Sequence, residues 1–146
     1  MGDKNFTMTP IKCFKSSYSQ NQVFLVEQSS RYTIINNEYK GIIVLDADWN
    51  EVKRIYIDED ILLPEIIYVD FSRNRLVLVL EETYCFIDID NEFVKLIPIP
   101  QEFKTVRFKT LYHFTDDAVY MNTNKGVLYW SLEDFTVQLI EDVQVT

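Results

Sequence analysis

Residues 84–99 read YCFIDIDNEFVKLIPI, and this stretch is the clearest indication of the fold class. Two short runs of apolar, β-branched and aromatic residues flank the polar triplet Asp90–Glu92. Such runs favour β-strands and such a triplet favours a tight turn, so the stretch predicts a β-hairpin. No segment carries a helical apolar stripe longer than two turns, and Asp58–Pro64 allows one helical turn at most because Pro64 would end it.

The same strand–turn–strand pattern occurs twice more, in residues 42–57 and 127–140. The polar residue that closes the first run falls at Asp46, Asp88 and Ser131, at spacings of 42 and 43 residues. The segments that precede these hairpins also match one another. The sequence therefore predicts three repeats, at approximately residues 22–58, 66–100 and 106–142.

A period of 40–45 residues with four strands is typical of a propeller blade. We therefore predict a single all-β domain over residues 1–146, built from antiparallel four-stranded meander repeats as a three-bladed partial propeller. The alternative is a β-sandwich whose self-similarity is accidental. The chain has only three glycines, so we expect Asn and Asp, which tolerate left-handed backbone, to occupy the tight turns.

The segment Phe86–Asp90 followed by Phe93–Ile97 resembles the strand–turn–strand of the YVTN and NHL-like blade classes. The Trp-Asp pair of WD40 blades is absent, and glycine is scarcer than in typical blades. The resemblance implies an architecture. It carries over no functional residue, because propellers share a framework and not a chemistry.

Three blades do not close a propeller, and an incomplete array leaves sheet surface uncovered at its ends. Two outcomes follow from this. The chain forms a homodimer that completes a ring of about six units, or it stays monomeric with its ends capped by other means. The segment Thr9–Lys15 would then supply a strand that covers one edge.

The net charge is −9, and residues 61–146 carry −7 of it. An acidic surface repels nucleic acids and anionic membranes, and it attracts basic proteins. The plainer interpretation is that the charge keeps a small domain soluble. No apolar run has the length of a signal peptide or a membrane span, so we expect a cytoplasmic protein.

The composition excludes several kinds of site. Glycines at positions 2, 41 and 126 alone cannot form a phosphate-binding loop or a nucleophile elbow. Cys13, Cys85 and His113 are too few and too distant for a structural zinc site. We predict that Cys85 is a buried free thiol and that His113 is an ordinary strand residue. The expectation is no metal, no cofactor and no enzyme activity.

Two carboxylate pairs are the best candidates for chemistry. Asp46 with Asp48, and Asp88 with Asp90, would each share one face of a strand. Such pairs suit glycoside hydrolysis or calcium binding, so a carbohydrate-binding or hydrolytic module is an alternative. The plainer interpretation is that these residues cap turns, because they fall at equivalent places in the repeat.

The leading hypothesis is a non-enzymatic protein–protein interaction module, in its specific form an acidic inhibitor or immunity-type protein that binds a basic partner. The alternative is a structural subunit that self-associates to complete a ring. The acidic turns and one tryptophan in a turn are the predicted contact residues: Trp49, Asp58, Glu59, Asp60, Asp116, Asp117, Glu133 and Asp134.

Overall fold

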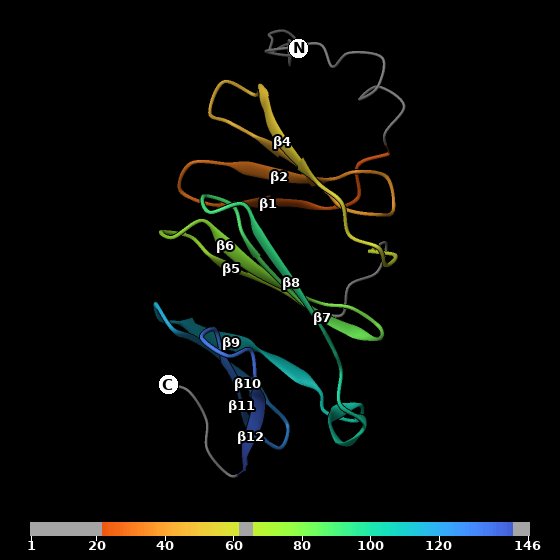
Figure 1. The fold of residues 1–146 in the computed structure, drawn as a ribbon, viewed down its shortest axis with the longest axis vertical. Helices are drawn as coiled ribbons and strands as arrows, with labels where there is room; N and C mark the ends of the chain where they lie inside the picture. Colours follow the sequence, from red (N-terminus) through yellow and green to blue (C-terminus); the bar gives the residue numbers. More distant parts are fainter. Residues whose placement is uncertain (1–21, 62–65, 142–146) are drawn as a thin grey trace, which may run out of the picture. The chain divides into compact units, whose positions relative to one another are not determined.

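The computed structural model describes residues 22–61 and 66–141, which form three four-stranded antiparallel sheets (Figure 1). The all-β prediction is therefore confirmed. The chain divides into two compact units, residues 1–62 and 63–146. The predicted strand at Thr9–Lys15 lies outside the described residues. Within the described ranges, no helix is long and apolar enough to cross a membrane.

The first sheet forms a meander in which each strand pairs with the next along the chain. Its two central strands are buried on both faces: residues 42–45 are all apolar, and residues 33–36 place Ile34 and Ile35 on opposite faces between the polar Thr33 and Asn36. Ile35, Ile43 and Leu45 form one cluster. The strands are β1 (Val26–Gln28), β2 (Thr33–Asn36), β3 (Ile42–Leu45) and β4 (Glu51–Ile55).

The buried side chain of Asn36 closes one end of this sheet. Its carbonyl oxygen accepts from the backbone N–H groups of Phe24 (2.9 Å) and Leu25 (3.2 Å). Its amide group donates to the carbonyls of Gln22 (2.9 Å) and Glu38 (3.0 Å). A buried polar side chain is tolerated when all of its hydrogen bonds are formed in this way.

Residues 58–61, which follow the fourth strand, contain no helical turn.

The second and third sheets repeat the same meander (Figure 1). A single 3₁₀ turn, η1 (Gln101–Phe103), lies in the segment that connects them. The second sheet comprises β5 (Ile66–Asp70), β6 (Arg75–Val79), β7 (Thr83–Asp88) and β8 (Phe93–Pro98). The third comprises β9 (Phe108–Phe114), β10 (Ala118–Thr123), β11 (Gly126–Ser131) and β12 (Val137–Glu141).

An aromatic-rich core joins the second sheet to the third. Tyr84 and Phe86 from β7 contact Trp130 from β11, with ring centroids 5.9 and 6.1 Å apart. Tyr68 stacks on Tyr112 at 4.3 Å. Fully buried aromatic side chains each stabilise a fold by about 1.5–3 kcal/mol, so this interface holds the two sheets as one unit. The core residues are Tyr68, Val77, Val79, Tyr84, Phe86, Phe114, Val119, Met121, Leu128 and Trp130.

The turn between the third and fourth strands confirms the repeat. In each sheet it contains one residue with positive φ: Trp49 (66°), Glu92 (54°) and Phe135 (59°). These residues are 43 apart in both intervals, so the structural equivalent of Asp46 is Ile89. The residues that adopt positive φ differ from the expected Asn and Asp, since only Asn74 among the non-glycine cases is one of these.

Packing explains why these bulky residues accept a backbone conformation that costs about 1–2 kcal/mol. Phe135 packs beside Phe93 and Phe86, with ring centroids 5.5 and 6.3 Å away. In the first sheet, the Asp46 carboxylate accepts the backbone N–H groups of Asp48 and Asn50, both at 2.9 Å. Asp46 thus stabilises the turn through its side chain, while Trp49 adopts the positive φ.

Candidate partner-binding rim

Two turns of the third sheet bring the acidic residues at 116–117 and 133–134 together. The first turn joins β9 to β10 and the second joins β11 to β12, so a meander places both at the same end of the sheet. The backbone N–H of Leu132 donates to the carbonyl of Asp117 at 2.7 Å and links the turns directly. Four of the eight predicted contact residues therefore lie close together.

The corresponding turns of the second sheet extend this end. The Asn74 carbonyl accepts from the Ile89 N–H at 3.0 Å, and the Asn74 amide donates to the Asp90 carboxylate at 3.1 Å. Arg73 Nε donates to Asp116 Oδ1 at 2.9 Å, which connects the second sheet to the third. The four turns thus form one continuous rim, which we call the acidic rim.

The charge of the acidic rim is strongly one-sided. Arg73 is its exposed cation, and it already pairs with Asp116 and Asp70. Asp117 and Glu133 are exposed, and neither side chain has a partner among the described residues. The rim's carboxylates, two of them from the second sheet, are Asp90, Glu92, Asp116, Asp117, Glu133 and Asp134.

Local hydrogen bonds fix two members of the rim in their charged form. The Thr136 hydroxyl donates to Asp134 Oδ1 at 2.8 Å, and with the Thr136 N–H at 3.2 Å it lowers the pKa of Asp134. The hydrogen bond to Asp116 raises the pKa of the Arg73 guanidinium. Asp134 therefore keeps its negative charge to lower pH than an ordinary carboxylate.

The opposite end of the same two sheets has a mixed charge. Acidic and basic residues occur there together: Glu81, Glu82, Glu102 and Glu141 with Lys104, Arg107 and Lys125. Lys104 forms an ion pair with Glu82. The excess of negative charge in this half of the chain is thus concentrated at one end.

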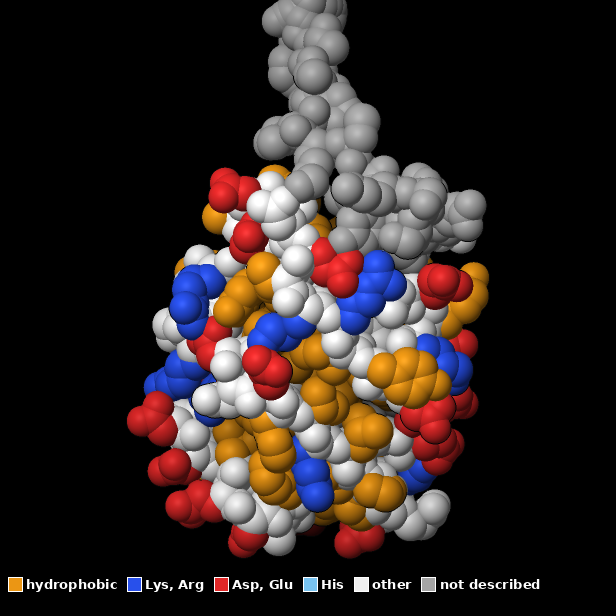
Figure 2. Space-filling view, turned by 45° about the horizontal axis from the view of Figure 1, so that its top comes forward, with side chains coloured by type: hydrophobic (Ala, Val, Ile, Leu, Met, Phe, Trp, Pro, Cys, Tyr) orange, Lys and Arg blue, Asp and Glu red, His pale blue; other side chains and the backbone are white. Residues whose placement is uncertain are grey.

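Large apolar side chains also reach the surface, where Figure 2 shows them among charged ones. Phe71 is 59% exposed in the turn between β5 and β6, next to the acidic rim. Leu111 and Ile140 are 57% and 38% exposed on the third sheet. Exposed aromatic residues beside complementary charge are frequent anchors in protein interfaces, so Phe71 joins the candidate site.

The remaining predicted contact residues are divided between two ends of the first sheet. Trp49 is 37% exposed in the β3–β4 turn. Asp58–Asp60 follow β4 at the other end, where the Ile61 N–H donates to the Tyr39 carbonyl at 2.8 Å. Tyr56 donates to Asp58 at 3.1 Å, and this bond raises the pKa of the Tyr56 hydroxyl. These residues therefore do not form one surface with each other.

The paired aspartates cap turns. Asp46 accepts two backbone N–H groups of its own turn, and Asp88 accepts the Asn91 N–H at 3.2 Å and its amide at 2.9 Å. A cleft of about 80 Å³ beside Gln28–Thr33 includes Asp46 and none of the other three. One aspartate of each pair, Asp46 or Asp88, thus has a local structural role in its turn, as the plainer interpretation predicted.

Cys85 is a buried free thiol, as predicted. His113 is an exposed residue of β9 whose ring lies 6.2 Å from that of Tyr120. In residues 22–61 and 66–141, no three His, Cys, Asp or Glu side chains are grouped so that they could hold a metal ion.

The predicted contact residues did not include four members of the rim, Phe71, Arg73, Asp90 and Glu92, and Asp90 was considered only as part of a carboxylate pair. The repeat carried a signal for them, because a shift of 43 residues relates Asp90 to Glu133 and Arg73 to Asp116. The equivalence of turns was thus readable from the sequence. The contact of one repeat with the next was not, because it depends on packing.

No family model matches the chain, and no curated protein matches it. Several solved structures resemble it in fold. HIRA(644–1017) aligns with a TM-score of 0.63 and 12% identity, over 84% of this chain and 40% of that one. The WD40 domain of SCAP from fission yeast aligns with a TM-score of 0.51 and 11% identity, over 89% and 36%.

An extracellular domain of a putative one-component system from B. thetaiotaomicron aligns with a TM-score of 0.58 and 12% identity, over 88% of this chain and 18% of that one. The chain thus spans well under half of these structures. At such identities the likeness concerns the fold: the three sheets are propeller-like blades.

Proposed function

We propose that the protein is a protein–protein interaction module that binds a basic partner through the acidic rim. The observation that carries this proposal is the gathering of six carboxylates from three adjoining turns beside the exposed Phe71 of a fourth turn. Such a surface accelerates association with a basic protein and selects against acidic ones. Phe71 supplies the apolar contact that charge alone does not provide.

The comparisons are compatible with this role. One of the matched structures is a complex of the fission yeast SREBP and SCAP binding domains, with a TM-score of 0.55 and 12% identity over 99% of this chain and 42% of that one. Blade-like frameworks therefore include protein-binding ones. The specific form of the proposal is an inhibitor or immunity-type protein that covers the functional site of a basic partner.

The proposal is tested by isolating the partner and removing rim charge. The tagged protein captures partners from cell extract at low salt, and the affinity of the purified partner is measured for wild type and for Asp117→Asn/Glu133→Gln. Both side chains are exposed, and neither forms a hydrogen bond or an ion pair within residues 22–61 and 66–141. Exposed ion pairs contribute about 0.2–1 kcal/mol each, so the affinity should fall about two- to thirtyfold.

The control is Glu81→Gln, which removes an exposed carboxylate at the opposite end of the same two sheets. It should leave the affinity unchanged. Binding should also weaken as salt rises, because exposed charges are screened within about 10 Å at 0.1 M ionic strength. Equal losses in the two variants, or binding that is insensitive to salt, would refute the rim as the contact surface.

A second candidate function is self-association through the third sheet. The register places Tyr120, Tyr129 and Ile140 on one face, together with the exposed Leu111 and His113. We call this face of the third sheet its outer face. The residues that precede Tyr120, Tyr129 and Ile140 by 43 positions are Val77, Phe86 and Ile97, and they face the core between the second and third sheets.

The composition of this face favours an apolar contact. None of its strand residues is Asp or Glu, although the protein is strongly acidic. Leu111 is 57% exposed, and Tyr120 and Tyr129 are half-buried, with ring centroids 5.1 Å apart. A copy of the chain docked there would complete more of a ring.

Absolute mass by light scattering tests this candidate at low and high salt. A dimer that persists in both, and that Leu111→Lys/Ile140→Lys dissociates, would support it. Leu96→Lys, at an exposed position of β8, is the matched control and should stay dimeric. A monomer in both salts excludes self-association and leaves the rim proposal untouched.

A further inference from the structure

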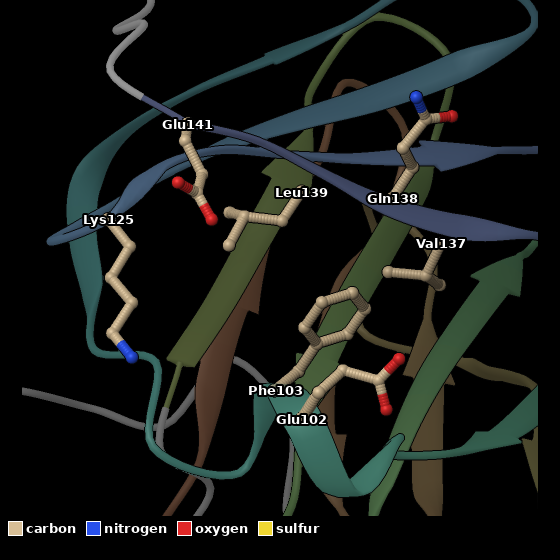
Figure 3. Close-up of a pocket in the computed structure, with 7 residues that line it drawn as sticks. All are labelled: Glu102, Phe103, Lys125, Val137, Gln138, Leu139 and Glu141. Carbon is tan, nitrogen blue, oxygen red and sulfur yellow. The ribbon is translucent and has the colours of Figure 1, made fainter.

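A cleft lies at the mixed-charge end of the second and third sheets, which is the end opposite the acidic rim. This cleft of about 550 Å³ separates η1 from β12. Figure 3 shows the Phe103 ring facing Val137 and Leu139 across this cleft, with Lys125 and Glu141 toward one end and Glu102 toward the other. Its volume falls within the range of 300–1,000 Å³ that is usual for ligand sites.

The wall that carries Phe103 is held in place at both of its ends. The Ile99 N–H donates to the Glu82 carbonyl at 2.9 Å before η1. After it, the Arg107 N–H donates to Asn124 Oδ1 and the Asn124 N–H donates to the Arg107 carbonyl, both at 2.9 Å. Lys104 also pairs with Glu82. The cleft is therefore preformed and pays little ordering cost when it is filled.

The charged residues at the cleft favour one kind of ligand. Lys125 Nζ lies 3.3 Å from the Thr105 hydroxyl. Glu102 and Glu141 are exposed, and in residues 22–61 and 66–141 neither carboxylate forms an ion pair or a side-chain hydrogen bond. Two unpaired carboxylates and one ammonium at the rim of an apolar floor favour a ligand with a cationic head and an apolar stem.

We propose that this cleft binds an arginine side chain presented by a peptide segment of a partner protein. The aliphatic stem lies along Val137 and Leu139, and the planar guanidinium stacks on Phe103 and pairs with a carboxylate. Lys125 donates to a carbonyl of the peptide backbone. Arginine fits better than lysine because its head is flat and can bind a carboxylate through two parallel hydrogen bonds.

The test is a titration of the ¹⁵N-labelled full chain with acetyl-Gly-Arg-Gly-amide, followed by amide chemical shifts. The matched probe is acetyl-Gly-citrulline-Gly-amide, which has nearly the same shape without the charge. Amides of Phe103 and β12 should shift with the arginine peptide and much less with the citrulline peptide. The Glu102→Gln variant should weaken binding by about two- to fivefold.

Glu81→Gln is the control, because Glu81 is an exposed carboxylate at the same end and does not line the cleft. It should bind as wild type does. Equal shifts with both peptides, shifts spread over all acidic turns, or a stronger response to acetyl-Gly-Glu-Gly-amide would overturn the proposal. The acidic rim lies at the other end and is tested with other variants, so failure here does not affect it.

Discussion

The buried ion pair between Asp70 and Arg75 should hold the second and third sheets together. Asp70 ends β5 and Arg75 begins β6, directly opposite in register, and each is 6% exposed. Arg75 donates to Asp70 Oδ2 from Nη2 at 2.6 Å and from Nε at 2.9 Å. The same guanidinium donates to the carbonyls of Thr115 (2.5 Å) and Asp116 (3.1 Å) across the interface.

We expect Asp70→Asn to cost more than Arg75→Met. The first change leaves a buried guanidinium without its counter-ion, and breaking a buried pair in this way costs about 3–5 kcal/mol. The second leaves the Asp70 carboxylate beside Arg73, whose Nη1 lies 3.3 Å from both oxygens. Its cost should therefore be smaller, about 2–3 kcal/mol, below the usual range for breaking such a pair.

The double variant should be less destabilised than the sum of the single ones, by about 1–3 kcal/mol, because the two groups interact directly. The assay is urea unfolding followed by tryptophan fluorescence in a Trp49→Phe background. Trp130 then reports on the core between the second and third sheets, where it is fully buried. Additive losses, or an Asp70→Asn cost below about 1 kcal/mol, would refute an ion pair that matters to stability.

Three further predictions concern single positions. Gly126→Ala should destabilise by about 2 kcal/mol or more, because a Cβ there would lie 2.1 Å from the Ile140 carbonyl oxygen at φ +135°; a smaller loss in urea unfolding would contradict this. Asn36→Ala should cost about 1–3 kcal/mol, since four bonds are lost, and an unchanged melting temperature would argue against it. Thr136→Val should raise the pKa of Asp134 in an NMR titration, because it removes the hydroxyl that lowers that pKa. The folded pKa is below the unfolded one, so the bond stabilises above the unfolded pKa and its contribution is lost as pH falls through the folded pKa; identical titration curves would refute this.

The residues of the acidic rim could be predicted from the sequence to different degrees. Asp116, Asp117, Glu133 and Asp134 follow from the sequence, because acidic residues between two strand patterns must lie in turns. Their nearness to one another also follows from the meander. Phe71 was missed, because an aromatic residue in a strand pattern is normally counted toward the core.

The all-β class, the three repeats and the positions of their turns follow from the amino-acid sequence alone. These features depend on residue types at local spacing, and a period of two along each strand is legible without any tertiary contact. The equal spacing of 43 residues between Trp49, Glu92 and Phe135 shows how closely the turns follow the repeat.

Which turns meet, and which charged side chains pair, depends on how the sheets pack. Arg73 reaches Asp116 across 43 residues, and the cleft beside Phe103 exists because a connecting segment is bonded at both ends. Such contacts depend on how one sheet packs against the next. Packing is set by the combined shapes of many side chains, which no local pattern contains.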